Sequence, residues 1–253
     1  MKRTWIHHAI IVNEGRRFVG SVVIEGEKIQ EVIEGDGAPA AVCDEQIDAQ
    51  GCFLLPGVID DHVHFRDPGL THKADMATET AAAAAGGVTS FMDMPNCTPQ
   101  TTTLEALENK FKDAATKCIV NYSFYFGATN NNADQLKALD KTHVCGVKLF
   151  MGASTGNMLV DRMEALKKIF SEAGMLIATH CEDQQIIREN TERFKQQYGD
   201  DLDISFHTLI RSEDACYHSS ALAVQLAKDR KSTRLNSSHI TSSYAVFSLK
   251  KKR

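Results

Sequence analysis

Residues 52–69 read CFLLPGVIDDHVHFRDPG, in which an apolar run ends in two histidines one residue apart, followed by an arginine and an Asp-Pro-Gly turn. The apolar run predicts a strand, whose successive side chains point to opposite faces. His62 and His64 therefore share a face, where two imidazoles can bind one metal ion. The spacing alone is weak evidence, because ten histidines in 253 residues would produce such a pair in roughly a third of chains by composition.

Downstream of this stretch, strand-like and helix-like segments alternate. Strands are expected at residues 57–65, 88–95, 119–128, 144–153 and 175–183. Helices are expected after them at residues 72–87, 101–117, 132–141, 160–174, 184–199 and 212–228. Five strand–helix units in succession predict a parallel sheet, so the expected fold class is α/β, an incomplete TIM-type (β/α)8 barrel.

Upstream, residues 1–55 alternate apolar and polar positions with period two, with glycine and charged turns between the runs. This pattern predicts a small antiparallel β unit. The barrel segment then covers residues 56–228.

Composition limits the class of protein. The seven cysteines are scattered without any C-x-x-C pair, which is typical of free thiols in a reducing compartment. No apolar run approaches the roughly 20 residues that cross a bilayer, and the N-terminus carries charges where a signal peptide needs an apolar core. The formal charge of −5 gives no basis for nucleic-acid binding. We expect a cytoplasmic protein that binds neither membranes nor nucleic acid.

Polar residues follow the predicted barrel strands at their carboxyl ends, where barrel enzymes place their reactive groups. These residues are His62 and His64 on the first strand, Asp93 and Asn96 on the second, Lys148 on the fourth and His180 on the fifth. Burial beside metal ions should lower the pKa of a lysine and leave a neutral, nucleophilic amine. With carbon dioxide, such an amine forms a carbamate, whose two oxygens can bridge two metal ions.

Each of these residues also has a plainer interpretation. Lys148 could reach solvent from a strand end, His180 could be a core or helix-capping residue, and Asn96 could be a turn residue between two prolines. Their joint occurrence at successive strand ends favours a site. His7, His8, His72 and His143 lie outside the strand ends, so we expect them to be surface residues.

The motifs DDHVHFRDPG, MDMPN, GVKLFMGASTGNM and ATHCED together closely resemble the dihydroorotases of the cyclic amidohydrolase superfamily, and the resemblance covers residues 1–228. It implies that His62 and His64 bind one zinc ion and His180 a second, with Lys148 as N6-carboxylysine bridging both. Arg66 and Asn96 would hold the free carboxylate of the substrate. Residues 1–55 would be part of the small β-sandwich domain that flanks such barrels.

The implied reaction is the reversible hydrolysis of the cyclic amide of dihydroorotate to carbamoyl aspartate, a step of pyrimidine biosynthesis, by a zinc-bound hydroxide. The resemblance also suggests a homodimer. Hydantoinases and allantoinases share the metal ligands, but hydantoins lack the carboxylate that Arg66 and Asn96 would bind. A further alternative is an inactive dihydroorotase-like subunit that supports a partner such as aspartate transcarbamoylase.

Two family features are not found before Lys228, namely a further zinc-binding histidine on a sixth strand and an acid–base aspartate on an eighth. His207 and His218 are the remaining downstream histidines before that residue. Residues 229–253 contain seven Lys or Arg against one Asp, lack barrel periodicity and resemble a translated sequencing adapter. We expect a non-native, disordered tail on a truncated chain that is inactive and contains no catalytic acid–base residue.

Overall fold

The computed structural model describes residues 1–152, 156–229 and 235–237. The chain divides into two compact units, Met1–Val58 and Ile59–Arg253, which we call the N-terminal unit and the barrel unit. The sequence predicted a boundary after residue 55. No helix among the described residues is both long and apolar enough to cross a membrane.

The N-terminal unit is a five-stranded sheet in the order β3-β2-β1-β4, with β5 beside β1. Its strands are β1 (Arg3–Asn13), β2 (Arg16–Glu25), β3 (Lys28–Glu34), β4 (Glu45–Asp48) and β5 (Phe53–Leu54). The first three strands pair antiparallel, whereas β4 and β5 pair parallel with β1. The sheet is therefore mixed rather than antiparallel as predicted, because the chain crosses after β3 to the other edge of β1.

Local sequence accounts for the first hairpin. Asn13 pairs with Arg16, which leaves a two-residue loop of Glu14 and Gly15 with φ angles of 49° and 76°. Two consecutive positive φ angles form the turn whose twist matches that of a β-hairpin, and glycine adopts such angles without steric cost.

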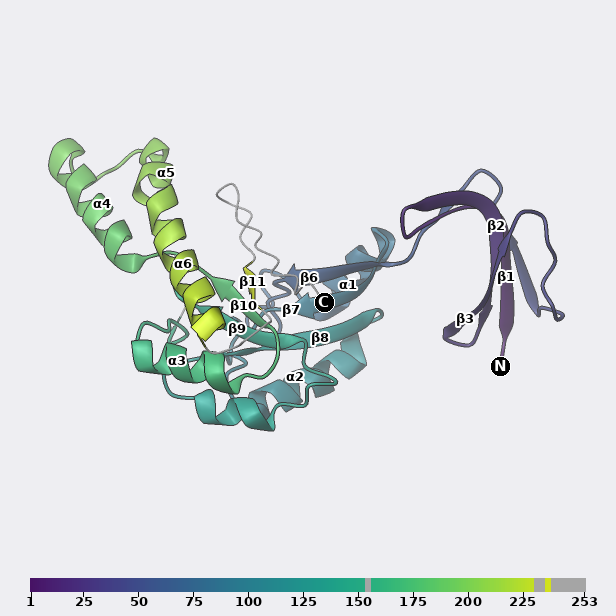
Figure 1. Ribbon diagram of the computed structural model, residues 1–253, viewed down its shortest axis with the longest axis horizontal. Helices are drawn as coiled ribbons and strands as arrows, with labels where there is room; N and C mark the ends of the chain where they lie inside the picture. Colours follow the sequence, from purple (N-terminus) through teal and green to yellow (C-terminus); the bar gives the residue numbers. More distant parts are fainter. Residues whose placement is uncertain (153–155, 230–234, 238–253) are drawn as a thin grey trace. The chain divides into compact units, whose positions relative to one another are not determined.

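The barrel unit contains a six-stranded sheet whose order follows the chain, from β6 to β11 (Figure 1). Its strands are β6 (Val58–Val63), β7 (Val88–Asp93), β8 (Asn121–Gly127), β9 (Gly146–Phe150), β10 (Ile177–His180) and β11 (Leu235–Ser237). Adjacent strands from β7 to β11 pair in parallel. Sequential order is the arrangement of a (β/α) barrel, whereas a doubly wound sheet reverses its order. The predicted fold class is confirmed.

Helices follow the strands in alternation. They are α1 (Met76–Ala85), α2 (Leu104–Lys117), α3 (Met163–Glu172), α4 (Gln184–Tyr198), α5 (His207–Ile210) and α6 (Glu213–Asp229), with 3-10 turns η1 (Ala133–Ala138) and η2 (Ile204–Phe206). The side chains of Asp75, Thr103 and Asp183 cap α1, α2 and α4. The helix predicted at 132–141 is only the 3-10 turn η1, and the Asn132 side chain before it donates to Gly127 O at the end of β8 and does not cap the turn.

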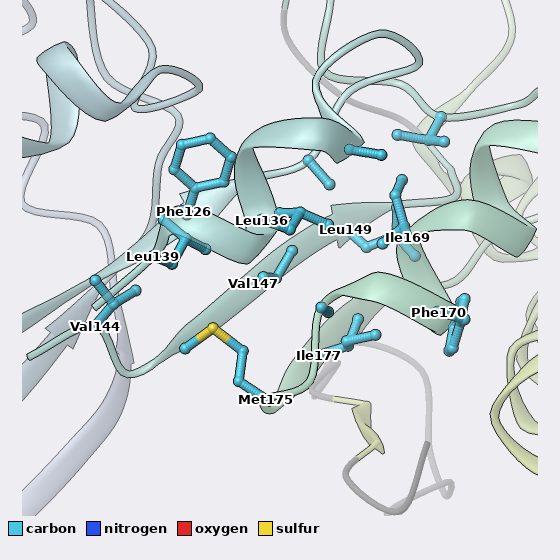
Figure 2. Close-up of a cluster of buried hydrophobic side chains, with 14 of the residues drawn as sticks. Phe126, Leu136, Leu139, Val144, Val147, Leu149, Ile169, Phe170, Met175 and Ile177 are labelled. Carbon is cyan, nitrogen blue, oxygen red and sulfur yellow. The ribbon is translucent and has the colours of Figure 1, made fainter. Parts of the chain in front are cut away.

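The main core lies between the sheet and the helices on one of its faces. Figure 2 shows Val147 and Leu149 of β9 and Ile177 of β10 packed against η1 and α3. We call this group the helix-side cluster; it also contains Phe65, Phe91 and Phe124. Because strand residues alternate, the positions between these residues point to the opposite face, which we call the inner face.

Three residues of the predicted tail, Leu235–Ser237, form β11 and pair in parallel with β10. Residues 230–234 and 238–253 lie outside the described residues. The assignment of residues 229–253 to a non-native, disordered tail therefore stays a prediction.

Candidate active site

The two histidines of the opening motif come together as predicted. Val63 packs against the helix-side cluster, so His62 and His64 on either side of it point to the inner face. Their ring centroids lie 5.3 Å apart. His62 belongs to β6 and His64 directly follows it.

The ring of His64 is oriented by Asn96, whose Oδ1 lies 2.7 Å from His64 Nδ1. Burial lowers the pKa of His64 below its usual 6.5, although the bond to Asn96 opposes this effect; the charges of Arg66 and Lys148 lower it further. A neutral imidazole that donates Nδ1–H to an amide oxygen presents the lone pair of Nε2 outward. In that tautomer, Nε2 of His64 could bind a metal ion.

Asp93 ends β7, as the sequence predicted, but its side chain anchors this segment and does not point to the inner face. It follows Phe91 by two residues and so shares the helix-side face. Its Oδ1 accepts the N–H of Phe65 at 2.9 Å, and its Oδ2 lies 2.6 Å from Lys110 Nζ. Both charged side chains are 1% exposed. Lys110 was missed by sequence reasoning, although its spacing from Leu107 marks it as a residue of the buried face of α2.

A second ion pair, between a buried carboxylate and a partly exposed lysine, holds the loop that carries Arg66. Asp67 is buried, and its Oδ2 lies 3.0 Å from Lys117 Nζ and accepts the N–H of Met76 at 3.3 Å. Arg66 itself has a φ of 62°, a left-handed conformation that is uncommon for residues other than glycine. The loop therefore presents Arg66 from a fixed backbone.

Arg66 and Asn96, the two residues predicted to bind a substrate carboxylate, both line one pocket of about 590 Å³. The described lining also includes Gln100, Gly156 and Asn157, but none of the four predicted metal ligands. Asn96 joins the two parts of the site, because it lines the pocket and bonds His64.

Lys148 does not reach solvent. It lies between Val147 and Leu149 of the helix-side cluster, so its side chain points to the inner face, where it is 1% exposed. Its Nζ has no hydrogen-bond partner among the described residues and lies 5.0 Å from the ring centroid of Phe150. Burial lowers the pKa of Lys148 to about 8. An amine that is deprotonated this readily is a nucleophile near neutral pH.

His180 is the last residue of β10. It lies on the inner face together with Ala178, which is the register partner of Lys148 on β9. His180 Nε2 lies 2.8 Å from Glu182 Oε2, which also accepts a bond from Arg211 at 2.5 Å. Burial raises the pKa of Glu182, but the bonds from His180 and Arg211 outweigh it and lower that pKa to about 2. Sequence reasoning missed this carboxylate, although its place directly after the strand was a signal.

The structure thus puts all four predicted metal ligands on the inner face of the sheet. The ring of Phe150 lies near both Lys148 and His180, with its centroid 5.0 Å from Lys148 Nζ and 6.0 Å from the centroid of the imidazole. His62, His64 and His180 do not converge on one point within 4.8 Å, since the one such group in the described part of the chain lies elsewhere. A site that binds two metal ions does not need all three histidines within ligand distance of one point. His207 and His218 are exposed and are not brought to this face.

The family model of the amidohydrolases matches residues 53–241, about three quarters of the chain. The chain belongs to the amidohydrolase family. A dihydroorotase of Methanosarcina acetivorans is 33% identical over 236 residues, which cover 92% of this chain and 49% of that protein. An allantoinase of Deinococcus radiodurans is 34% identical over 197 residues, covering 74% of this chain and 42% of its own length.

Solved structures of amidohydrolases have the same fold. An L-hydantoinase (dihydropyrimidinase) from Arthrobacter aurescens superposes with a TM-score of 0.87 at 25% identity, over 95% of this chain and 53% of that one. The chain therefore spans about half the length of the relatives it matches. Relatives with three different names match similarly, so the comparisons support the family and leave the substrate open.

Proposed function

We propose that the protein is a zinc-dependent dihydroorotase, in which residues of the inner face bind two metal ions and the pocket binds the substrate carboxylate. The observation that carries this proposal is the placement of Asn96. Its Oδ1 accepts from His64, so its amide N–H groups remain as donors toward the pocket that Arg66 also lines. An arginine fork and an amide donor are well suited to a carboxylate.

The donor set fits the metal. The orphaned Nζ of Lys148 is buried without a hydrogen-bond partner among the described residues, a costly arrangement unless the group has another use. As a carbamate, Lys148 would hold two zinc ions together with His62, His64 and His180. When bound, the ions would supply a hydroxide nucleophile near neutral pH and polarise the amide carbonyl.

The residues of this chain have separate tasks in the proposed reaction. Arg66 and Asn96 would fix the ring of dihydroorotate by its carboxylate and so orient the amide carbonyl toward the histidines. Asp93 would keep His64 in place through the Phe65 N–H, and Asn96 would hold its tautomer. Asn96 would therefore couple substrate orientation to the metal ligand.

Ligand binding tests the proposal more sharply than turnover, because it measures the contribution of the substrate carboxylate directly. Dihydrouracil is the matched ligand, since it has the ring of dihydroorotate without the carboxylate. Calorimetric titration of the zinc-loaded chain should show dihydroorotate binding at least about tenfold more tightly than dihydrouracil. Arg66→Met should remove that preference, whereas Arg193→Met, on the exposed side of α4, should keep it.

Equal binding of both ligands, or an unchanged preference in Arg66→Met, would contradict a carboxylate-binding role. Tighter binding of hydantoins or allantoin, which also lack the carboxylate, would favour the hydantoinase or allantoinase alternative.

A further inference from the structure

A second pair of histidines lies in the N-terminal unit, at an irregularity of β1. The pairing of β1 with β2 runs from Arg3 to Ile6, resumes at Ala9, and shifts register between them. His7 and His8 occupy this bulge. Adjacent strand residues normally face opposite sides, but His8 has a φ of 57°, which turns its side chain toward that of His7. The two rings meet edge to face with centroids 4.5 Å apart.

A carboxylate on the neighbouring strand completes the group. Asp48 is the register partner of His7 in the parallel pairing of β1 and β4. His8 Nδ1 lies 3.2 Å from Asp48 Oδ1 and 3.0 Å from His7 Nδ1. In the described part of the chain, this is the one group of three or more His, Cys, Asp or Glu whose ligand atoms all lie within 4.8 Å of one another.

These separations match those of ligand atoms around one metal ion. Zinc–nitrogen and zinc–oxygen bonds of about 2.0–2.1 Å place tetrahedral ligands about 3.3 Å apart. We propose that His7, His8 and Asp48 bind one divalent transition-metal ion of the zinc, copper and nickel class. Two imidazoles and a carboxylate are ligands that this class of ion accepts. The side chains of His8 and Asp48 are 52% and 54% exposed, so water can complete the coordination.

The protonation of the group favours a cation. The two Nδ1 atoms face each other at 3.0 Å, so at most one of them carries a proton along that line and the other presents a lone pair. The Asp48 carboxylate is kept ionised and oriented, because its Oδ1 accepts the N–H of Gln50 at 3.0 Å. A metal ion would replace the shared proton and satisfy all three groups together.

A bound ion would cross-link β1 and β4. The edge strand β4 pairs with β1 at only four positions, from Thr4 with Glu45 to His7 with Asp48. An ion held by His7, His8 and Asp48 would fasten the last of these positions. The site is independent of the proposed function, because all of its residues belong to the N-terminal unit.

Trp5 provides a local reporter for the test. It is the only tryptophan of the chain, and its ring centroid lies 4.4 Å from that of His7. Copper and nickel ions quench the fluorescence of a nearby indole, whereas zinc does not. Titration of the tag-free full chain with nickel should therefore quench Trp5 along a saturable one-site curve, and zinc should reverse the quenching by competition.

Variants assign the quenching to the site. His8→Asn tolerates the positive φ, and Asp48→Asn keeps the side-chain shape, so both should fold and should raise the nickel concentration at half-quenching at least about tenfold. His143→Asn is the matched control, because His143 and Asp140 form an exposed pair at 2.6 Å without a second histidine. It should titrate like the parent chain, as should a His62→Asn/His64→Asn double variant.

Linear, non-saturating quenching would overturn the proposal, as would unchanged half-quenching in both His8→Asn and Asp48→Asn. The group would then be a hydrogen-bonded surface cluster only. An unquenched emission spectrum of Trp5 that matches the parent chain shows that each variant has folded. Loss of tight quenching in the His62→Asn/His64→Asn variant alone would place the ion on the barrel unit and equally refute the assignment.

Discussion

The described part of the chain contains two pairs of neighbouring histidine rings, and the pairs are built differently. His62 and His64 alternate along a strand and share a face through the pleat alone. His7 and His8 are adjacent in the sequence. Their rings come into contact only because a bulge and a positive φ at His8 redirect the side chain of His8. The first geometry follows from spacing, whereas the second depends on how β1 pairs with β2.

The surroundings of the two pairs also differ. Partly buried His64 is oriented by Asn96, and its neighbour Phe65 bonds the buried carboxylate of Asp93. His8 is exposed, and Asp48 is its only charged partner among the described residues. Interactions removed from water are strong and costly to break, while exposed ones contribute little. Disruption around the first pair should therefore cost far more than disruption around the second.

Lys110→Met is the strongest test of this difference. It would leave the Asp93 carboxylate buried without its ion-pair partner, and we expect the free energy of unfolding to fall by about 3–5 kcal/mol. Lys112→Met on the same helix removes an exposed pair with Glu108 and should cost less than about 1 kcal/mol. Urea unfolding followed by far-UV circular dichroism measures both. Equal losses would show that burial does not separate the two environments.

The buried amine of Lys148 predicts the next largest effect, a dependence of stability on pH. Its pKa is lowered from 10.5 to about 8 in the folded chain, first by burial. Between these values the unfolded chain binds more protons, so stability rises with pH across that window. At about 1.36 kcal/mol per pKa unit the rise amounts to at most about 3 kcal/mol.

The measurement compares urea unfolding at about pH 7.5 and pH 10 in metal-free, carbonate-free buffer, for the parent chain and Lys148→Met. Other groups that titrate in this range contribute equally to both proteins, so the difference between the two pH slopes isolates Lys148. Parallel slopes would mean that the lysine is protonated in the folded state and is not prepared to form a carbamate.

Much of the barrel was predictable because its signals are local. Each strand is an apolar run that is followed by a helix. Because side chains alternate along a strand, the positions of His64 and Lys148 put both on the same face of the sheet. The ion pairs beside Arg66 and His180 could not be predicted in the same way. Lys117 reaches Asp67 over 50 residues and Arg211 reaches Glu182 over 29, so only the folded chain brings them together.

The N-terminal unit marks the limit of prediction from spacing. Alternation predicted its strands, but no pattern within β1 indicates that the register shifts at His7 and His8. The sequence placed both histidines at the surface, where His8 is exposed and His7 is partly buried, but the meeting of their rings depends on the partner strand and was not predicted. The local sequence pattern also did not predict that β4 pairs in parallel with β1 and so brings Asp48 to the two histidines.

Asn96→Ala should produce a smaller effect, confined to the pair of His62 and His64. Loss of the bond to His64 Nδ1 frees the imidazole to rotate and to change tautomer, which typically weakens metal affinity about 10–100-fold. Zinc calorimetry on the metal-free chain would measure it. Asn121→Ala is the control, since that amide bonds only backbone and a serine at the edge of β7. An unchanged zinc affinity in Asn96→Ala would remove Asn96 as the residue that orients His64.

The smallest expected effect is a change in unfolding free energy that has opposite signs for glycine variants of His8 and His7. Glycine adopts a positive φ freely, so His8→Gly should relieve strain and stabilise the metal-free N-terminal unit by roughly 0.5–1 kcal/mol. His7 has no such strain, and His7→Gly should destabilise the unit by a similar amount, because glycine weakens a strand. Urea unfolding followed by Trp5 fluorescence reports on this unit, which contains the only tryptophan. Opposite signs would establish that the bulge holds His8 against its own backbone preference, whereas a loss of stability in both variants would mean that the hydrogen bonds of His8 outweigh the strain.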